Sequence, residues 1–193
     1  MILKRLPVGP LRANCFILGD EDTGNALVID PGDEADLILK TLEDESLSVS
    51  KILCTHGHPD HVGGAYSLSR ATGAPIYLHP EDARLYNINA EHSLSEKEEI
   101  ELDSIKIKVL HTPGHTPGSV CFLCGNWLFT GDTLFAGGVG RTDLPGGNTE
   151  KLMNSLVEKI VNLPHHLEIL PGHGDMSRLS WELEGNPFLQ GLC

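Results

Sequence analysis

Three histidines and one aspartate stand within six positions of the chain. The segment 55–61 reads Thr-His-Gly-His-Pro-Asp-His and follows a short apolar run at 51–55. Gly57 and Pro59 oppose a regular helix here and favour a tight loop. A lone histidine would be interpreted as a surface residue, but four metal-binding side chains this close together are hard to explain as solvent-exposed residues without a function. Imidazole and carboxylate groups suit Zn, Fe, Mn or Co, so the segment predicts a metal site at His56, His58, Asp60 and His61.

Three further side chains of the same kind each follow an apolar run. His115 follows the run that ends at 110, Asp132 follows 127–130, and His173 follows 167–170. In open α/β sheets, ligands gather just past the carboxyl ends of strands, so we expect these side chains to meet. Seven ligands are one more than three for each of two metals. We therefore expect two divalent metals bridged by one carboxylate.

The elements that must position these residues alternate between strands and helices. Short apolar runs predict strands and amphipathic stretches predict helices, which favours an α/β fold with sheets inside and helices outside. The stretch 87–103 is polar and is expected to be mostly loop, and 131–147 is a glycine-rich loop. The expected strands are 2–6, 15–19, 26–30, 51–55, 75–78, 105–110, 119–124, 127–130 and 167–170, and the expected helices are 33–41, 64–72, 80–86, 149–162 and 177–183.

Composition excludes several classes of protein. The 193 residues contain 14 Lys and Arg against 27 Asp and Glu, a net charge of −13. A polyanion would be repelled on average, which argues against a nucleic-acid partner. Hydrophobic residues make up 40%, too many for a disordered chain. No segment approaches the roughly 18 apolar residues of a membrane span and no signal peptide is evident, so we expect a cytoplasmic protein with no membrane partner.

The remaining cysteines and histidines are weaker candidates. Cys121 and Cys124 stand three apart in an expected strand, so they should face opposite sides of a sheet, and we interpret the chain's five cysteines as core and surface thiols. His111 lies four positions before His115. It is either a partner that orients a ligand or a residue without a role in the site. Four other histidines are expected at the surface: His79, His92, His165 and His166.

The sequence resembles the metallo-β-lactamase superfamily, because all the ligand-bearing segments occur in order along nearly the whole chain. The segment 131–147, Gly-Asp-Thr-Leu-Phe-Ala-Gly-Gly-Val-Gly-Arg-Thr-Asp-Leu-Pro-Gly-Gly, narrows the resemblance to short, single-domain glyoxalase II-like (hydroxyacylglutathione hydrolase-like) proteins. The resemblance implies one domain over 1–193, an αββα sandwich of two mixed sheets flanked by helices, and a site at one edge. It also implies that His56, His58 and His115 hold one metal, that Asp60, His61 and His173 hold the other, and that Asp132 bridges them.

Such a site points to hydrolysis. Two divalent metals that share a water lower its pKa from about 15.7 toward 7, and the resulting hydroxide can attack a carbonyl carbon. We expect Zn, with Fe or Mn as alternatives, and catalytic roles for Asp60 and Asp132, which balance the metal charge. Asp60 could also orient the hydroxide. A thiolate leaves without protonation, whereas an amide nitrogen must be protonated. The loops offer no spare acid unless His111 serves, which favours a small-molecule thioester substrate.

The resemblance implies the substrate class S-2-hydroxyacyl-glutathione. Full-length glyoxalase II enzymes hold glutathione with a C-terminal helical domain that this sequence lacks, so glutathione recognition is left open. Arg141 and Asp143 either bind a substrate carboxylate or stabilise the glycine-rich loop. The alternative functions are a mononuclear-iron persulfide dioxygenase of the same superfamily and another metallo-hydrolase acting on an ester or lactone. The oligomeric state is left open.

Overall fold

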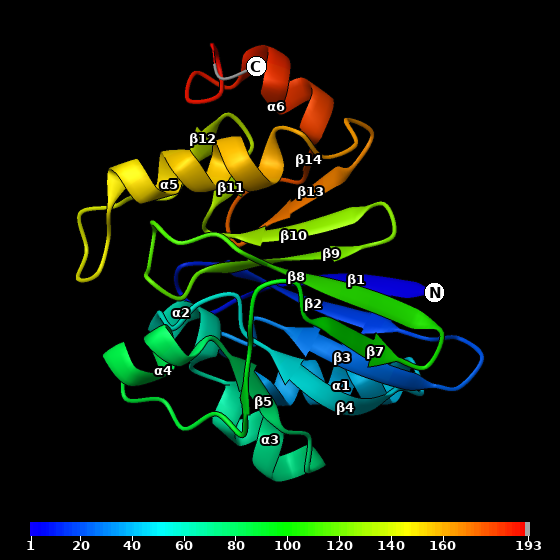
Figure 1. Ribbon diagram of the computed structural model, residues 1–193. Helices are drawn as coiled ribbons and strands as arrows, with labels where there is room; N and C mark the ends of the chain where they lie inside the picture. Colours follow the sequence, from blue (N-terminus) through cyan, green and yellow to red (C-terminus); the bar gives the residue numbers. More distant parts are fainter. Residues whose placement is uncertain (192–193) are drawn as a thin grey trace.

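Two six-stranded sheets pack face to face and carry helices on their outer faces in the computed structural model, which describes residues 1–191 (Figure 1). This architecture confirms the predicted αββα sandwich of the α/β class. The first sheet contains β1 (Ile2–Val8), β2 (Ala13–Gly19), β3 (Asn25–Ile29), β4 (Ser48–Leu53), β5 (Ile76–Leu78) and β6 (His92–Ser93). The second contains β7 (Glu99–Leu102), β8 (Ile105–His111), β9 (Val120–Cys124), β10 (Trp127–Gly131), β13 (Glu168–Pro171) and β14 (Ser177–Arg178).

The first sheet is mixed and has the strand order β1-β2-β3-β4-β5-β6. β1, β2 and β3 pair antiparallel through short turns, whereas β3, β4, β5 and β6 pair parallel. Parallel neighbours need crossover connections, and helices run in each of them. These are α1 (Ala35–Asp44), α2 (Pro59–Val62) with α3 (Ala65–Thr72), and α4 (Pro80–Leu85). β3, β4 and β5 therefore all end at the same edge of the sheet.

The second sheet has the order β14-β13-β10-β9-β8-β7, with β10 and β13 parallel and the other pairs antiparallel. The crossover between β10 and β13 contains α5 (Thr149–Ser155), which continues as a π-helical turn over Leu156–Ile160. A small ribbon, β11 (Leu134–Phe135) with β12 (Gly138–Val139), follows β10, and α6 (Leu179–Gly185) follows β14.

Apolar side chains form three layers that follow this arrangement. Between the sheets, Phe16 of β2 meets Phe129 of β10 edge to face, with ring centroids 5.3 Å apart. A second layer lies under α1 and α3, and a third lies under α5 and α6 (Figure 1). Burial of these helix faces supplies the driving force that fixes the helices against the sheets.

One prediction of local structure is wrong, and another is incomplete. Pro59 does not prevent a helix, because it occupies the first position of α2, where a helix has no use for the missing N–H. The stretch 87–103 is mostly loop, as predicted, but it also includes the short strands β6 and β7, which were not predicted. Ile100 and Leu102 of β7 alternate with exposed glutamates and are buried, a period-two pattern typical of a half-exposed strand.

Cys121 and Cys124 lie on opposite faces of β9, as their spacing predicts. Cys121 packs with the layer under α5, and Cys124 packs between the sheets. The expectation of a surface thiol is wrong for this pair, because both are buried, and burial raises the pKa of each thiol to about 11. Cys193 lies outside the described residues.

The helices are short, and α1 has only 10 residues. Within residues 1–191 no helix combines the length and the apolar character that crossing a bilayer requires.

Candidate metal centre

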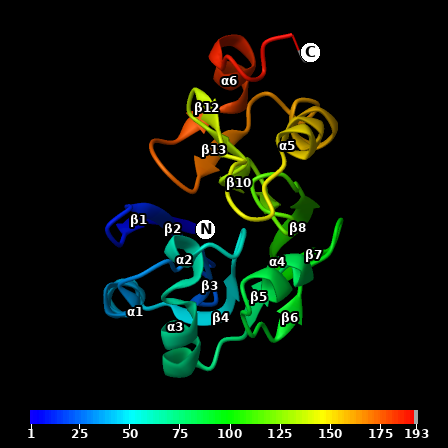
Figure 2. The same cartoon turned by 90° about the vertical axis from the view of Figure 1, so that its left-hand side faces the viewer.

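The seven side chains predicted to ligate metals lie together at one edge of the sandwich. The loop after β4 and the helix α2 supply four of them, and the loops after β8, β10 and β13 supply one each. α2 lies between the two halves of the molecule (Figure 2), where strand ends from both sheets meet. The seven residues are His56, His58, Asp60, His61, His115, Asp132 and His173.

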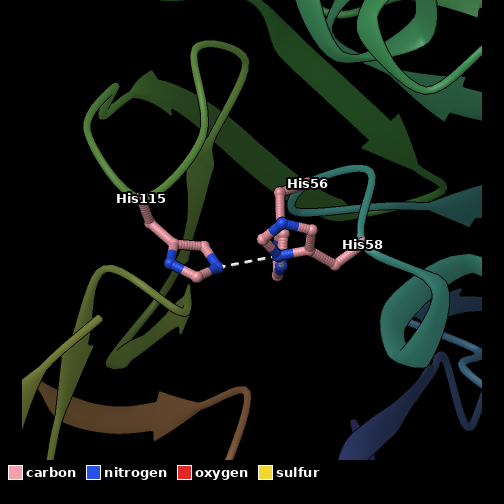
Figure 3. A group of neighbouring side chains, drawn as sticks. All are labelled: His56, His58 and His115. Atoms are coloured by element: carbon pink, nitrogen blue, oxygen red, sulfur yellow. Dashed lines mark hydrogen bonds between the residues drawn. The ribbon is translucent and has the colours of Figure 1, made fainter. Parts of the chain in front are cut away.

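His56, His58 and His115 form a compact group, here called the three-histidine group. In Figure 3, His56 and His58 come from one loop and face His115 from the other sheet. Nδ1 of His58 lies 3.1 Å from Nε2 of His56 and 2.9 Å from Nε2 of His115. His56 and His115 are buried, and His58 is half-buried. Three imidazole nitrogens that converge in this way are the donor set of many catalytic zinc sites.

Asp60, His61 and His173 form a second group, here called the Asp60 group. Nε2 of His173 lies 3.1 Å from Oδ2 of Asp60 and 3.2 Å from Nε2 of His61. Burial raises the pKa of the Asp60 carboxyl, but the hydrogen bond from His173 and the charge of His61 outweigh it and bring that pKa to about 2. This group therefore presents a carboxylate beside two imidazoles.

Asp132 lies between the two groups. Its Oδ1 is 3.4 Å from Nε2 of His61, and its Oδ2 is 3.5 Å from Nε2 of His115 and 3.8 Å from Nε2 of His173. Oδ1 is buried and has no hydrogen-bond partner within residues 1–191, although buried polar atoms normally have one. A cation next to this oxygen would satisfy it, so the residues fit two divalent metals bridged by Asp132.

Asp30 and Thr55 hold two of the ligand histidines from behind. Asp30 Oδ2 lies 2.9 Å from Nδ1 of His61, and Asp30 also accepts hydrogen bonds from the backbone N–H and the hydroxyl of Thr55 at 2.7 and 2.6 Å. The Thr55 hydroxyl in turn lies 3.1 Å from Nδ1 of His56. These contacts engage the outer ring nitrogens and leave Nε2 of both histidines free to face the site.

The sequence prediction missed Asp30 and Thr55. Asp30 directly follows the buried strand β3, whose carboxyl end lies at the same edge as that of β4. The strand-end rule that selected the seven ligands would have selected Asp30 as well, had it been applied to this strand.

The outer nitrogens of His58 and His115 also have partners. Nε2 of His58 lies 3.0 Å from the Tyr86 hydroxyl, and Nδ1 of His115 lies 2.7 Å from the backbone oxygen of Arg141, to which it donates when protonated. Burial and the charge of Asp82 raise the pKa of Tyr86 to about 12, so its hydroxyl stays protonated at neutral pH.

The surrounding residues shift the pKa values of two of the predicted ligands, His61 and His58, in opposite directions. Burial disfavours a charged ring at His61, but the carboxylates of Asp132 and Asp30 outweigh it and raise the pKa of His61 to about 9. At His58, burial and the nearby His115 lower the pKa to about 4. Perturbed groups concentrated at the end of several strands are typical of a functional site.

The backbone approaches this centre so closely that only glycine fits. A Cβ on Gly172 would lie 2.3 Å from Oδ1 of Asp132 and 2.6 Å from Cε1 of His61. A Cβ on Gly140 would lie 1.8 Å from the backbone oxygen of Asp132. The glycines that follow β13 and β12 thus let two loops close over the ligands.

A cleft of about 520 Å³ opens onto the centre. Arg141 lines it, but its Nε and Nη2 donate to the two carboxylate oxygens of Asp143 at 2.7 and 2.8 Å, and both side chains are exposed. Five ligands and Arg141 share this wall with Leu11, Pro59, Phe135, Val139 and Leu144.

His111 lies apart from the ligands. Its Nε2 is 2.9 Å from the backbone oxygen of Pro117, and its ring stacks on His79 at 4.2 Å. His79 is half-buried and not the surface residue that was predicted. It also caps α4 by accepting the N–H of Glu81. The other three predicted surface histidines are exposed, namely His92, His165 and His166.

Residues 8–173 match the family model of the metallo-beta-lactamase superfamily. The chain belongs to the metallo-β-lactamase superfamily. Members of this superfamily are mostly hydrolytic enzymes and bind divalent metals. Membership agrees with the fold and with the donor set described above.

Three similar proteins cover nearly all of this superfamily member. The hydroxyacylglutathione hydrolase GloC of Haemophilus influenzae is 35% identical over 98% of both chains. The crystal structure of the BLEG-1 B3 metallo-beta-lactamase has a TM-score of 0.92 at 33% identity and covers 98% of this chain and 100% of its own. TTHA1623, solved in a di-iron-bound form, has a TM-score of 0.84 at 36% identity and covers 96% of this chain and 100% of its own.

Proposed function

We propose that this superfamily member is a dinuclear metal-dependent thioester hydrolase that acts on S-2-hydroxyacyl-glutathione. The observation that carries the proposal is the position of Asp132 between the two ligand groups, with a buried oxygen that has no hydrogen-bond partner within residues 1–191. The printed name of GloC, which is similar over nearly its full length, supports the substrate class.

The metals, when bound, would lower the pKa of a water and polarise the substrate carbonyl. The side chains of the protein would balance the metal charge, orient the water and position the ligands. Asp60 and Asp132 supply negative charge to the cations. The low pKa of Asp60 keeps its carboxylate ionised, so that it can accept a hydrogen bond from a water molecule and orient it. Asp30 and Thr55 hold the rings of His61 and His56, so the centre is organised before substrate enters.

The lining of the cleft supports a thiolate leaving group. Arg141 is the one side chain in this wall, among the described residues and apart from the ligands, that carries an ionisable group. Its hydrogen bond to Asp143 raises its pKa further, so it is no proton donor at neutral pH. His111, the other candidate acid, is turned away toward Pro117 and His79. A thiolate needs no proton to leave, whereas an amine does.

Either Zn or Fe suits this donor set of imidazoles and carboxylates. The di-iron form of TTHA1623 supports iron, and the three-histidine group supports zinc. We propose zinc as the first metal to test, followed by iron and manganese. The Arg141–Asp143 pair at the mouth of the cleft is the proposed contact for a carboxylate of the glutathione part.

Thiol release from S-lactoylglutathione tests the proposal. Metal-free protein and protein reconstituted with Zn, Fe or Mn would be compared, with His115→Ala as the matched inactive variant. We expect turnover by the reconstituted wild type and none above background from the variant. Equal rates with and without metal would contradict the proposal.

Two competing reactions belong in the same experiment. The likeness to BLEG-1 favours β-lactam hydrolysis as a second candidate, but the absence of an acid in the described cleft lining leads us to expect a β-lactam to react on the order of 10²-fold more slowly. The persulfide dioxygenase alternative would consume oxygen with glutathione persulfide. Oxygen uptake by a form that holds one iron per chain, without thioester hydrolysis, would replace the proposed function with that one.

A further inference from the structure

Asp82 is a buried carboxyl group that lies close to the metal centre but contacts no metal ligand side chain. It stands on α4, and none of its surface is exposed. Its Oδ2 accepts the backbone N–H of Gly57 at 2.8 Å and the hydroxyl of Thr116 at 2.7 Å, and its Oδ1 accepts the backbone N–H of Gly118 at 2.6 Å. Three donors thus converge on one carboxyl group.

These donors belong to two loops that come from different sheets. Gly57 lies between His56 and His58 in the loop after β4, and Thr116 follows His115 in the loop between β8 and β9. The two loops therefore supply all three members of the three-histidine group, and Asp82 bonds to both of them. The Asp60 group comes instead from α2 and the loop after β13.

The fit around α4 is too close for other residues at the two glycines. A Cβ on Gly118 would lie 2.6 Å from Oδ1 of Asp82 and 2.8 Å from its backbone nitrogen. A Cβ on Gly57 would lie 2.3 Å from Cδ2 of Tyr86, which is one turn further along the chain. The Tyr86 hydroxyl in turn meets Nε2 of His58. The end of α4 is thus packed directly against the backbone of both ligand loops.

We infer that Asp82 is a positioning residue that holds the two loops of the three-histidine group in register, and so sets the metal affinity of that group and not of the Asp60 group. The inference rests on the dinuclear centre of the proposed function. The bond between Nδ1 of His58 and Nε2 of His115 spans the two loops at 2.9 Å, so a shift of one loop against the other would separate these ligands. Partners behind the ligands typically change metal affinity 10- to 100-fold.

The test is a titration of metal-free protein with Co²⁺, followed by its visible absorption, and with Zn²⁺ by calorimetry. His115→Ala and His173→Ala assign the two binding steps to the two groups. We expect Asp82→Asn to weaken the step of the three-histidine group about 10- to 100-fold and to leave the other step within about threefold of wild type. The amide keeps the shape of the side chain but turns an N–H toward one of the three donors.

A matched pair of variants covers the case in which Asp82→Asn does not fold. Thr116→Val removes one of the three hydrogen bonds, and Thr116→Ser keeps the hydroxyl. We expect the valine variant to lose affinity at the three-histidine group and the serine variant to resemble wild type. Equal affinities for the two variants, or a folded Asp82→Asn that binds both metals normally or weakens both steps alike, would overturn the inference. The readout needs no substrate, so a lack of thioesterase activity would contradict the proposed substrate alone.

Discussion

Oδ1 of Asp132 lies 3.4 Å from Nε2 of His61, yet this buried oxygen has no hydrogen-bond partner anywhere in residues 1–191. The other carboxylate oxygen lies 3.5 Å from Nε2 of His115 in the opposite group. A carboxylate that contacts two groups of ligands and is satisfied by neither is positioned to hold two cations together. The predictions below follow from this arrangement.

Replacing the bridging carboxylate should empty the centre. In Asp132→Ala, two cations at short range would repel each other without an intervening negative charge, so we expect metal content to fall below about one per chain and thioester hydrolysis to vanish with it. Metal analysis after gel filtration measures the change. Asp175→Asn is the control, because it removes a negative charge two positions after His173 from a side chain that is 95% exposed, and it should keep both metals. Retention of both metals by Asp132→Ala would contradict the bridge.

The two groups should differ in the protons they release on metal binding. The pKa of His61 is raised to about 9, so its ring is protonated at pH 7 and must lose that proton before it binds a metal. The pKa of His58 is lowered to about 4, so that ring is already neutral. Calorimetry in buffers of different ionisation enthalpy should show more proton release for the step assigned to the Asp60 group than for the step assigned to the three-histidine group.

The same pKa values fix how the affinity varies with pH. Proton release at the Asp60 group should disappear as the pH rises through about 9, and the apparent affinity of that group should rise over the same interval. Equal proton release in both steps, or an affinity of the Asp60 group that does not change between pH 7 and 9, would show that His61 is not protonated in the metal-free protein.

Variants of Arg141 and Asp143 distinguish a role of this pair in substrate binding from a role in the structure of the loop. If Arg141 binds a substrate carboxylate, Arg141→Ala should raise KM more than it lowers kcat, and Asp143→Asn should lower KM because it frees the guanidinium. Steady-state kinetics on S-lactoylglutathione give both constants. Changes of the same sign in the two variants, or an unchanged KM in Arg141→Ala, would assign the pair to the structure of the loop.

Gly172→Ala should damage the centre without unfolding the protein. The added methyl group would overlap Oδ1 of Asp132 and Cε1 of His61, so we expect lost metal affinity at both groups. The change in metal content would be measured beside the circular dichroism of the fold. Gly185→Ala is the matched control, because a Cβ there meets no atom within 4 Å. Normal metal content in Gly172→Ala would mean that the loop relaxes away from the ligands.

Features of the fold and of the site were predictable where a local sequence pattern determines them, and not where contacts between distant segments of the chain do. The predicted ligands follow a local rule, since each stands in a segment that follows an apolar strand, and the structure brings all seven side chains together. The layers follow from apolar runs and helical periodicity. The strand β7 was not predicted because its two apolar residues, Ile100 and Leu102, lie in a polar stretch. They become part of the core only because β7 pairs with β8.

Asp82 shows why the supporting residues were not predictable. It stands in the segment Pro-Glu-Asp-Ala-Arg, which reads as the exposed start of a helix, and its neighbour Glu81 is indeed exposed. Its burial arises because the backbones of Gly57 and Gly118 come to it from distant parts of the chain. No local pattern distinguishes the two acidic residues, so their different roles emerge only from the tertiary structure.

The dependence of activity on metal content tests the central claim most directly. Metal-free protein would be loaded with increasing equivalents of Zn²⁺, and the rate of thiol release from S-lactoylglutathione would be plotted against the metal bound per chain. The account predicts that the rate keeps rising beyond one equivalent and levels off at about two, because both groups and the bridging Asp132 act together. A rate that is already maximal at one equivalent, or no thiol release at any loading, would contradict it.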